Sequence, residues 1–197
     1  MVQVVLFHHV LGLTDGVRDL AERLSAGGSH QVSTPDLYGG EVAGSLEDGF
    51  AIKERLGDDV LTSRAEAALV DVLDDAVYAG ISLGVLTAQR FAQTRPGARG
   101  ALLYEACVPT TGDWAFGPWP DGVAVQVHGK DDDEFFAHEG DLDAARALVE
   151  AVGPDRGEVF AYPGDEHLFV DSSLPSFDAE ACALAVERSV AFLDRIG

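Results

Sequence analysis

The stretch YAGISLGVLTAQR, residues 78–90, predicts a strand that turns directly into a helix. Residues 75–81 are mostly apolar, as in a strand that is buried on both faces of a sheet. Residues 83–94 then carry apolar side chains at helical spacing, and Pro96 followed by Gly97 ends that helix. A buried strand followed at once by a helix is typical of a parallel α/β sheet.

The rest of the chain repeats this alternation of strand and helix. Further strands are predicted at residues 2–7, 31–34, 101–104, 123–128 and 158–162. Helices are predicted from Thr14 or Asp15 to Gly27 and Gly28, over much of 45–73 with a break at Leu56 and Gly57, and around 142–152 and 182–193. We therefore expect one α/β domain over residues 1–197, with a mostly parallel sheet covered by helices on both faces.

The composition limits the partners of the chain. Its formal charge of −21 at pH 7 argues against nucleic acid or an anionic membrane surface as the main partner. Two cysteines, Cys107 and Cys182, provide no disulfide framework and are expected to be buried apolar residues. Residues 1–16 lack the basic start of a signal peptide. We expect a cytoplasmic protein, a monomer or homodimer, that acts on a small molecule.

Ser82 stands where the strand ends and the helix begins, between Gly80 and Gly84. A nucleophile at this point occupies a sharp, strained turn, and the residues two before and two after it must be small. The pattern G-I-S-L-G fits that requirement, and the following helix would direct its N-terminus at a developing oxyanion. The alternative is that Ser82 is only a small residue in a tight turn of a chain with 22 glycines.

A serine hydroxyl needs a base to accept its proton, so a histidine must lie within reach. His167 lies in the loop YPGDEHLF (162–169), directly after a predicted strand. It alone satisfies both the order and the context expected of this chemistry. The other histidines precede the serine, lie inside a strand, or are expected at the surface: His8, His9 and His30 in the first group, then His128, then His138.

The acid that orients the histidine should follow the strand at 123–128. The segment HGKDDDEFF (128–136) places three aspartates there, at 131–133, of which one would orient the histidine and the others would be solvated. A metal site is the other interpretation of adjacent carboxylates. Neighbouring residues cannot all converge on one ion, and the spacing of a calcium loop is absent, so we expect no metal.

Together these segments resemble the dienelactone hydrolase family of α/β-hydrolases, and the likeness covers nearly the whole chain. It is carried by VVLFHHVLGLTDGVRDLAERLSAGG (4–28), TPDLYGG (34–40), GISLG (80–84), VHGKDDDEF (127–135) and YPGDEHLF (162–169). The elbow around Ser82 is shared by many hydrolases, whereas the opening helix followed by PDLYGG is more particular to this family. The resemblance implies an α/β-hydrolase fold reduced to its core, without a cap domain.

The resemblance also implies roles for individual residues. Ser82 would be the nucleophile and His167 the base. The family's acid stands three residues after the glycine of its His-Gly turn, which selects Asp132, with Asp133 as the close rival. The oxyanion hole would be formed by the backbone N–H groups of Val10 and Leu83.

Four features depart from the family's pattern. The elbow carries Ser82 where the best-known dienelactone hydrolases have cysteine. His9 stands where members often have glutamate, so that it would touch substrate or line the cleft. Asp171 stands where dienelactone-cleaving members place an arginine, and would repel an anionic substrate. The chain also starts almost at the first core strand, without the additional N-terminal strands of longer members.

Aromatic residues could complete a substrate pocket near the elbow. Trp114, Phe116 and Trp119 follow the strand at 101–104, in a loop expected to overlie the elbow, and the alternative is that they close one end of the core. Tyr38 could approach the cleft or serve ordinary packing. With His9, the residues Tyr38 and Trp114 are our candidates for the substrate pocket.

The sequence thus predicts a serine hydrolase that cleaves a small carboxylic ester, lactone or thioester through an acyl-enzyme, without a cofactor. A non-catalytic binding or scaffold protein of the same fold is the alternative, motivated by the departures at His9 and Asp171. A related hydrolase that cleaves C–C or C–halogen bonds is a third hypothesis. Ser82 argues against cleavage of C–halogen bonds, because the enzymes that catalyse it mostly use an aspartate at the elbow.

Overall fold

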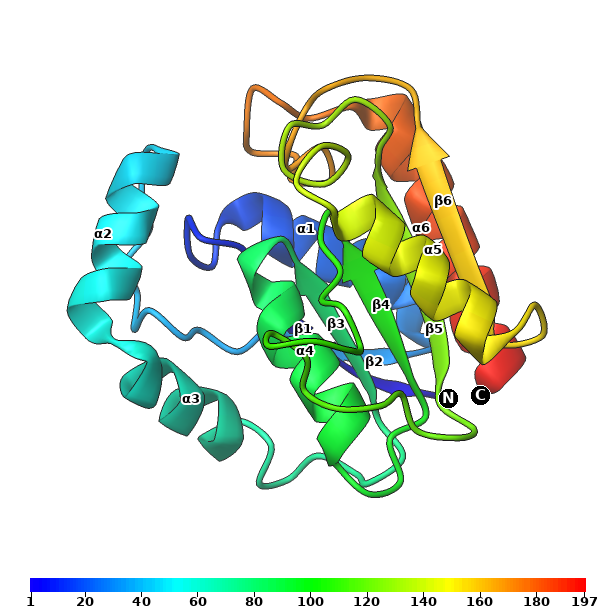
Figure 1. Ribbon diagram of the computed structural model, residues 1–197. Coiled ribbons are helices and arrows are strands. Elements are labelled where there is room, and N and C mark those ends of the chain that lie inside the picture. Colours follow the sequence, from blue (N-terminus) through cyan, green and yellow to red (C-terminus); the bar gives the residue numbers. More distant parts are fainter.

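The computed structural model describes residues 1–197 and contains one sheet of six parallel strands (Figure 1). The strands lie side by side in the order β2-β1-β3-β4-β5-β6, and every neighbouring pair is parallel. Their bounds are β1 Gln3–Phe7, β2 Gln31–Ser33, β3 Val77–Ile81, β4 Gly100–Tyr104, β5 Ala124–Lys130 and β6 Gly157–Tyr162. The predicted α/β class is therefore confirmed.

Helices cover both faces of the sheet (Figure 1). Those against one face are α1 (Asp15–Leu24) and α6 (Ala179–Ile196), and those against the other are α4 (Leu83–Thr94) and α5 (Asp141–Val152). Two more, α2 (Leu46–Leu56) and α3 (Asp58–Ala67), lie at the left of the molecule in Figure 1, with α3 next to α4, and a short 3-10 turn, η1, spans Ala26–Gly28. No helix is both long enough and apolar enough to cross a membrane.

Two hydrophobic cores lie on opposite faces of the sheet. Successive side chains of a strand point to opposite faces, and β1 shows this clearly. Val4 and Leu6 join the core beneath α1 and α6, whereas Val5 and Phe7 join the core beneath α4 and α5. The near-continuous apolar runs of the strands thus bury both faces, as the sequence predicted.

Most element boundaries agree with the sequence pattern. Thr14 caps α1 by accepting a hydrogen bond from the Val17 N–H, and Gly57 separates α2 from α3 with φ of 80°. The clearest difference is at β5, which was expected to end at His128 and continues to Lys130. Its last residues pair with β6 up to Tyr162, and this extension changes which aspartate faces the site.

The carboxyl ends of the strands all meet at one edge of the sheet. Ser82 follows β3, Glu105 follows β4, Asp133 lies in the turn after β5, and His167 lies in the loop after β6. In open parallel sheets this edge is where ligands bind. The topology therefore gathers residues from distant parts of the chain into one place.

Candidate active site

Ser82 occupies a strained turn between β3 and α4. Its φ of 48° and ψ of −114° are rare for a residue with a side chain. Its N–H donates to the Tyr104 carbonyl at 2.7 Å, and its own carbonyl accepts from the Val85 N–H at 2.9 Å. These bonds hold the turn between the end of β3 and the start of α4, where a nucleophile elbow was expected.

The glycines on either side of Ser82 are required by close backbone contacts. A methyl group at Gly80 would lie 2.5 Å from the Gly84 carbonyl carbon and 2.6 Å from the Val85 nitrogen. One at Gly84 would lie 2.6 Å from the His8 carbonyl oxygen, on the loop after β1. Real Cβ atoms do not approach so closely, so α4 could not pack against β1 and β3 with larger residues here.

Ser82, His167 and Asp133 form a continuous chain of hydrogen bonds. Ser82 Oγ lies 2.8 Å from His167 Nε2, and His167 Nδ1 lies 2.7 Å from Asp133 Oδ2. With the ring proton on Nδ1, the imidazole donates to Asp133 and leaves Nε2 free to accept from the serine hydroxyl. The ring also packs against Phe135 at 4.7 Å between centroids.

The environment of His167 favours the charged ring. Burial by itself lowers the pKa of the imidazole, but the hydrogen bond to Asp133 and the negative charges of Glu105, Asp133 and Asp141 outweigh that effect. The pKa of His167 is therefore raised above its ordinary value. A ring with a raised pKa holds a proton more firmly than an ordinary imidazole does.

The aspartate that contacts His167 is Asp133, so the preference for Asp132 is corrected. Asp133 is fully buried, whereas the Asp132 side chain is 73% exposed and its Oδ1 lies 2.9 Å from His138 Nε2 at the surface. β5 extends to Lys130, directly before the three aspartates. The N–H of Asp131 still donates to the Tyr162 carbonyl and that of Asp132 to the Gly164 carbonyl, so the chain turns inward one residue later than the family spacing implied.

The two backbone N–H groups expected to form an oxyanion hole have no backbone acceptor in the structure. Leu83 is the first residue of α4, so its N–H has no carbonyl partner within the helix. Val10 lies in the loop after β1, and its N–H donates to no other backbone group. Both groups are thus free to bind an anion, and their role stays a prediction.

His9 and Asp171 bind each other in the interior, so the two roles suggested for them are wrong. His9 is fully buried, and its Nε2–H donates to Asp171 Oδ2 at 2.7 Å while its Nδ1 accepts from the Leu11 N–H at 3.2 Å. Thr14 and Ser173 also donate to Asp171, which is itself fully buried. A carboxylate with these partners does not face substrate, and His9 is not part of the cavity lining.

Replacing Asp171 with asparagine is expected to lower stability without changing substrate charge preference. Burial by itself would raise the pKa of Asp171, but the hydrogen bonds from His9, Ser173 and Thr14 lower it to about 2. A lowered folded-state pKa stabilises the fold above the unfolded value near 3.8 and loses that contribution as the pH falls toward 2. We expect D171N to lose about 2 kcal/mol at pH 7 and less at pH 3.

Urea unfolding of both proteins at the two pH values measures this effect. The ratio of rates on neutral and anionic p-nitrophenyl esters provides the second readout. A ratio that shifted strongly toward anionic esters in D171N would show that Asp171 faces the substrate after all.

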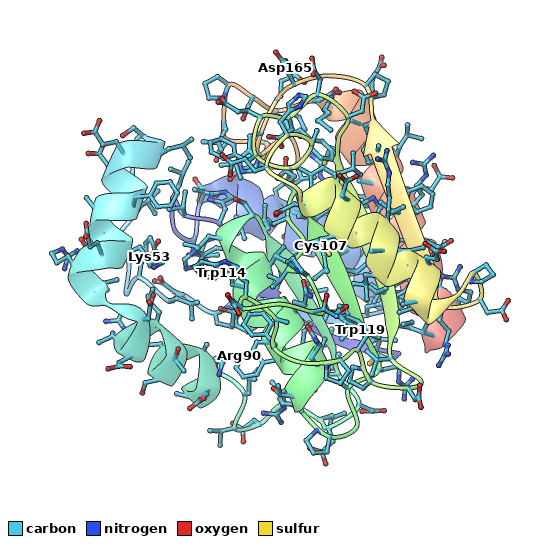
Figure 2. The ribbon with its side chains drawn as sticks, viewed as in Figure 1. Lys53, Arg90, Cys107, Trp114, Trp119 and Asp165 are labelled. Carbon is cyan, nitrogen blue, oxygen red and sulfur yellow. The ribbon has the colours of Figure 1, made fainter.

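A cavity of about 710 Å³ begins beside the elbow. It lies over the first half of α4, between α3 and the loop that follows β4, and Lys53, Arg90 and Trp114 lie around it (Figure 2). Leu83 and Gly84 line it directly next to Ser82, although Ser82 and His167 are not themselves part of the lining. About half of the lining residues are apolar, which suits a small, partly apolar ligand.

Of the three candidates for the substrate pocket, Tyr38 and Trp114 line this cavity. Trp114 is 84% exposed, so it does not close the core, whereas Trp119 packs against the core beneath α4 and α5. Tyr38 is buried edge-on against His8, and its hydroxyl has no protein partner. The histidine that lines the cavity is His8, and His9 does not line it.

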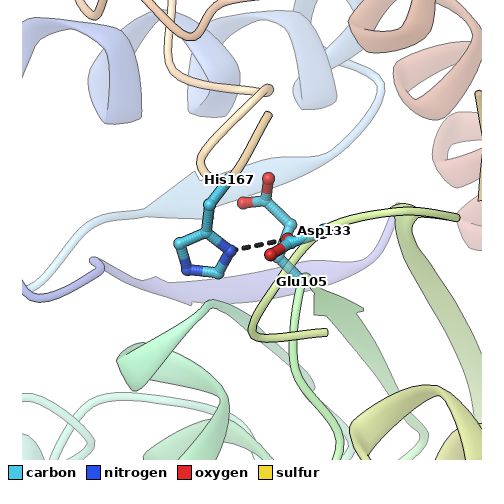
Figure 3. Close-up of side chains that lie close together, drawn as sticks. All are labelled: Glu105, Asp133 and His167. Atoms are coloured by element: carbon cyan, nitrogen blue, oxygen red, sulfur yellow. Dashed lines mark hydrogen bonds and ion pairs between the residues drawn. The ribbon is translucent and has the colours of Figure 1, made fainter. Parts of the chain in front are cut away.

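Glu105 is a site residue that the sequence reasoning missed. It directly follows β4, is 1% exposed, and its carboxyl lies in a group with Asp133 and His167 (Figure 3). A glutamate placed immediately after a buried strand was the available signal, because that position belongs to the carboxyl edge of the sheet. Burial raises the pKa of the Glu105 carboxyl to about 7.

Backbone strain also gathers around the site. Positive φ is rare for residues other than glycine, and it occurs at Ala26 and at three positions of this edge, namely Ser82, Glu105 and Leu168. Strain of this kind persists where the surrounding structure enforces it, and it is common at functional sites.

The group of Glu105, Asp133 and His167 offers ligand atoms that all lie within 4.8 Å of one another. Both ring nitrogens of His167 already have partners in Ser82 and Asp133. Binding a metal ion would break one of these bonds. The donor arrangement therefore fits proton transfer better than metal coordination.

Comparison with known proteins identifies the class of fold. No protein-family model and no curated protein matches the sequence. Among solved structures, a Klebsiella pneumoniae protein assigned as a dienelactone hydrolase is 17% identical with a TM-score of 0.74, and the match covers 98% of this chain and 86% of that one. At this identity the likeness shows the fold, which is the α/β-hydrolase fold.

Two further structures agree. A dienelactone hydrolase-like promiscuous phosphotriesterase from metagenomic libraries is 20% identical with a TM-score of 0.74, over 100% of this chain and 87% of that chain. An esterase from Thermogutta terrifontis with propionate bound is 16% identical with a TM-score of 0.66. The match covers 100% of this chain and 84% of the esterase chain. The chain therefore has the fold of dienelactone hydrolase-like α/β-hydrolases, as the sequence resemblance predicted.

Proposed function

We propose that this protein is a serine hydrolase that cleaves a small carboxylic ester, lactone or thioester through an acyl-enzyme. The observation that carries the proposal is the hydrogen-bonded chain from Ser82 to His167 at 2.8 Å and from His167 to Asp133 at 2.7 Å. It stands at the edge of the sheet where α/β folds bind ligands. The strained turn at Ser82 adds support, because it presents the hydroxyl above the strand.

In the proposed reaction, Ser82 Oγ attacks the carbonyl carbon while His167 Nε2 takes the hydroxyl proton. Asp133 stabilises the resulting imidazolium through its bond to Nδ1. The N–H groups of Leu83 and Val10 would bind the oxyanion, and one such donor is commonly worth about 3 kcal/mol. The imidazolium then gives its proton to the departing alcohol or thiol, or to the ring oxygen of a lactone. His167 next takes a proton from water, which attacks the acyl carbon, and the imidazolium returns that proton to Ser82 Oγ as the acid is released.

The cavity beside the elbow supports a neutral substrate with an apolar part. Apolar side chains of α3 and α4, including Leu61, Leu83 and Leu86, line it. The cationic lining residues are already paired, Lys53 with Asp58 at 2.9 Å and Arg90 with Glu66 at 3.5 Å. An esterase of the same fold is described with propionate bound, so p-nitrophenyl propionate is a suitable first substrate.

Labelling with a fluorophosphonate tests the proposal. We expect one covalent adduct per chain, located on Ser82 by peptide mass spectrometry, because the activated hydroxyl attacks phosphorus as it would a carbonyl. The variant S82A should remain unlabelled and should keep its melting temperature. An adduct on another residue would redirect the assignment.

A folded wild-type protein without an adduct would favour the non-catalytic alternative. That alternative was motivated by His9 and Asp171. Since these two residues are buried and bind each other, they no longer favour it.

A further inference from the structure

We propose that Glu105 is a positioning residue for the hydrolysis proposed above. Its buried carboxylate lies beside His167 and Asp133 and stabilises the protonated imidazole ring. It thereby sets the pH range over which His167 can accept the proton of Ser82. The inference rests on the proposed function for its catalytic consequence. The charge coupling between Glu105 and His167 does not depend on catalysis.

The geometry places Glu105 within the electrostatic reach of His167. Carboxyl oxygens of Glu105 and Asp133 and a ring nitrogen of His167 all lie within 4.8 Å of one another, and both carboxyl groups lie on one side of the imidazole ring (Figure 3). Because Glu105 and Asp133 are 1% and 0% exposed, water screens their charges poorly.

Glu105 has only part of the hydrogen bonding that a buried carboxylate requires. Oε1 accepts the Phe169 N–H at 2.7 Å, which ties the loop that carries His167 to the end of β4. Oε2 is buried and has no hydrogen-bond partner. A buried, unpaired carboxylate oxygen is costly, and a neighbouring positive charge would offset that cost.

The backbone at Glu105 is held in a conformation that favours glycine. Its φ is 64°, and its N–H donates to the carbonyl of His128 at 2.6 Å. A side chain at such a position carries a conformational cost. A functional role would explain why a carboxyl group is placed here despite this conformational cost and the cost of its burial.

The negative charges of Glu105, Asp133 and Asp141 all raise the pKa of the His167 ring. From the neighbouring elements, the ionisable groups that face this ring and Glu105 are Asp133 after β5, Asp141 at the start of α5 and Cys182 on α6, whose thiol stays neutral because burial raises its pKa to about 11. Burial and then the charge of Asp133 raise the pKa of Glu105, while His167 lowers it. The carboxyl and the ring therefore favour each other's charged form and titrate as a coupled group.

The variant E105Q separates this electrostatic role from a structural one. Glutamine keeps the shape and can still accept the Phe169 N–H, but it carries no charge. We expect the pKa of His167, followed by NMR titration of its ring in the full-length chain, to fall by about one pH unit or more. The acid limb of kcat/KM on p-nitrophenyl propionate should move to lower pH by a similar amount.

Two further variants complete the test. Glu134→Gln removes an exposed charge in the same turn as Asp133 and should leave the titration of His167 unchanged. Should E105Q fail to fold, E105G, which suits the positive φ, is expected to produce the same shift. Titration curves of His167 that coincide in the wild type and in the charge-free variant would overturn the proposal, as would a shift to higher pH. Because the NMR measurement needs no turnover, a protein that hydrolyses no ester would refute the proposed function while still deciding the role of Glu105.

Discussion

Replacing Asp133 with asparagine is expected to lower kcat for ester hydrolysis about 10⁴-fold. Asp133 Oδ2 accepts the Nδ1–H of His167 at 2.7 Å, while its Oδ1 accepts the Phe135 N–H at 2.9 Å. In D133N the amide can keep the second bond and would turn its NH₂ group toward His167. The ring proton would then move to Nε2, so that His167 could no longer accept the proton of Ser82.

The matched control is Asp132→Asn, one residue earlier in the same turn. Its side chain is exposed and contacts His138 at the surface, so kcat should stay within about twofold of the wild type. Steady-state kinetics on p-nitrophenyl propionate at pH 8, with circular dichroism to verify folding, measure both variants. A large loss in D132N with a small loss in D133N would restore the acid that the family spacing suggested.

Replacing Gly80 with alanine is expected to lower the free energy of unfolding by about 3 kcal/mol or more. The new methyl group would meet the backbone of Gly84 and Val85 in the first turn of α4. Backbone atoms cannot move aside as a flexible side chain can, and α4 is itself held against the loop after β1 at Gly84. The helix would have to shift away from β3, so esterase activity should be lost as well.

Gly44→Ala is the control for this substitution. Gly44 is exposed, and a methyl group there would meet no atom within 4 Å, so its unfolding free energy should stay within about 1 kcal/mol of the wild type. Urea unfolding monitored by circular dichroism compares the two. An unfolding midpoint of G80A equal to that of G44A would contradict the close packing at the elbow.

The alternation of strands and helices could be predicted from the sequence because each element depends on a local pattern. The apolar run of β3, the Thr14 cap of α1 and the break at Gly57 each follow from the preferences of a few neighbouring residues. The same is true of the elbow, since steric crowding around a sharp turn demands glycine at positions 80 and 84. Chain order and the strand before it were enough to select His167 as the candidate base.

Contacts between distant segments could not be predicted in this way. Whether Asp132 or Asp133 meets His167 depends on where β5 stops pairing with β6, which backbone bonds at Tyr162 and Gly164 decide. Neighbouring aspartates have nearly the same local preferences, so no pattern within the turn distinguishes them. The family offset of three residues selects Asp132, whereas the residue that contacts His167 is the next one, Asp133.

The fold class, the sharp turn at Ser82 and the loop that carries His167 could be predicted without coordinates, because short-range sterics and hydrophobic periodicity control them. The packing of distant segments was needed to show that Asp133 is the buried partner of His167 and that Glu105 lies beside them. It was also needed to show that His9 and Asp171 form a hydrogen bond in the interior. Burial and hydrogen bonding of a charged group are properties of everything packed around it. Those surroundings come from strands that are far apart in the chain and adjacent in the sheet.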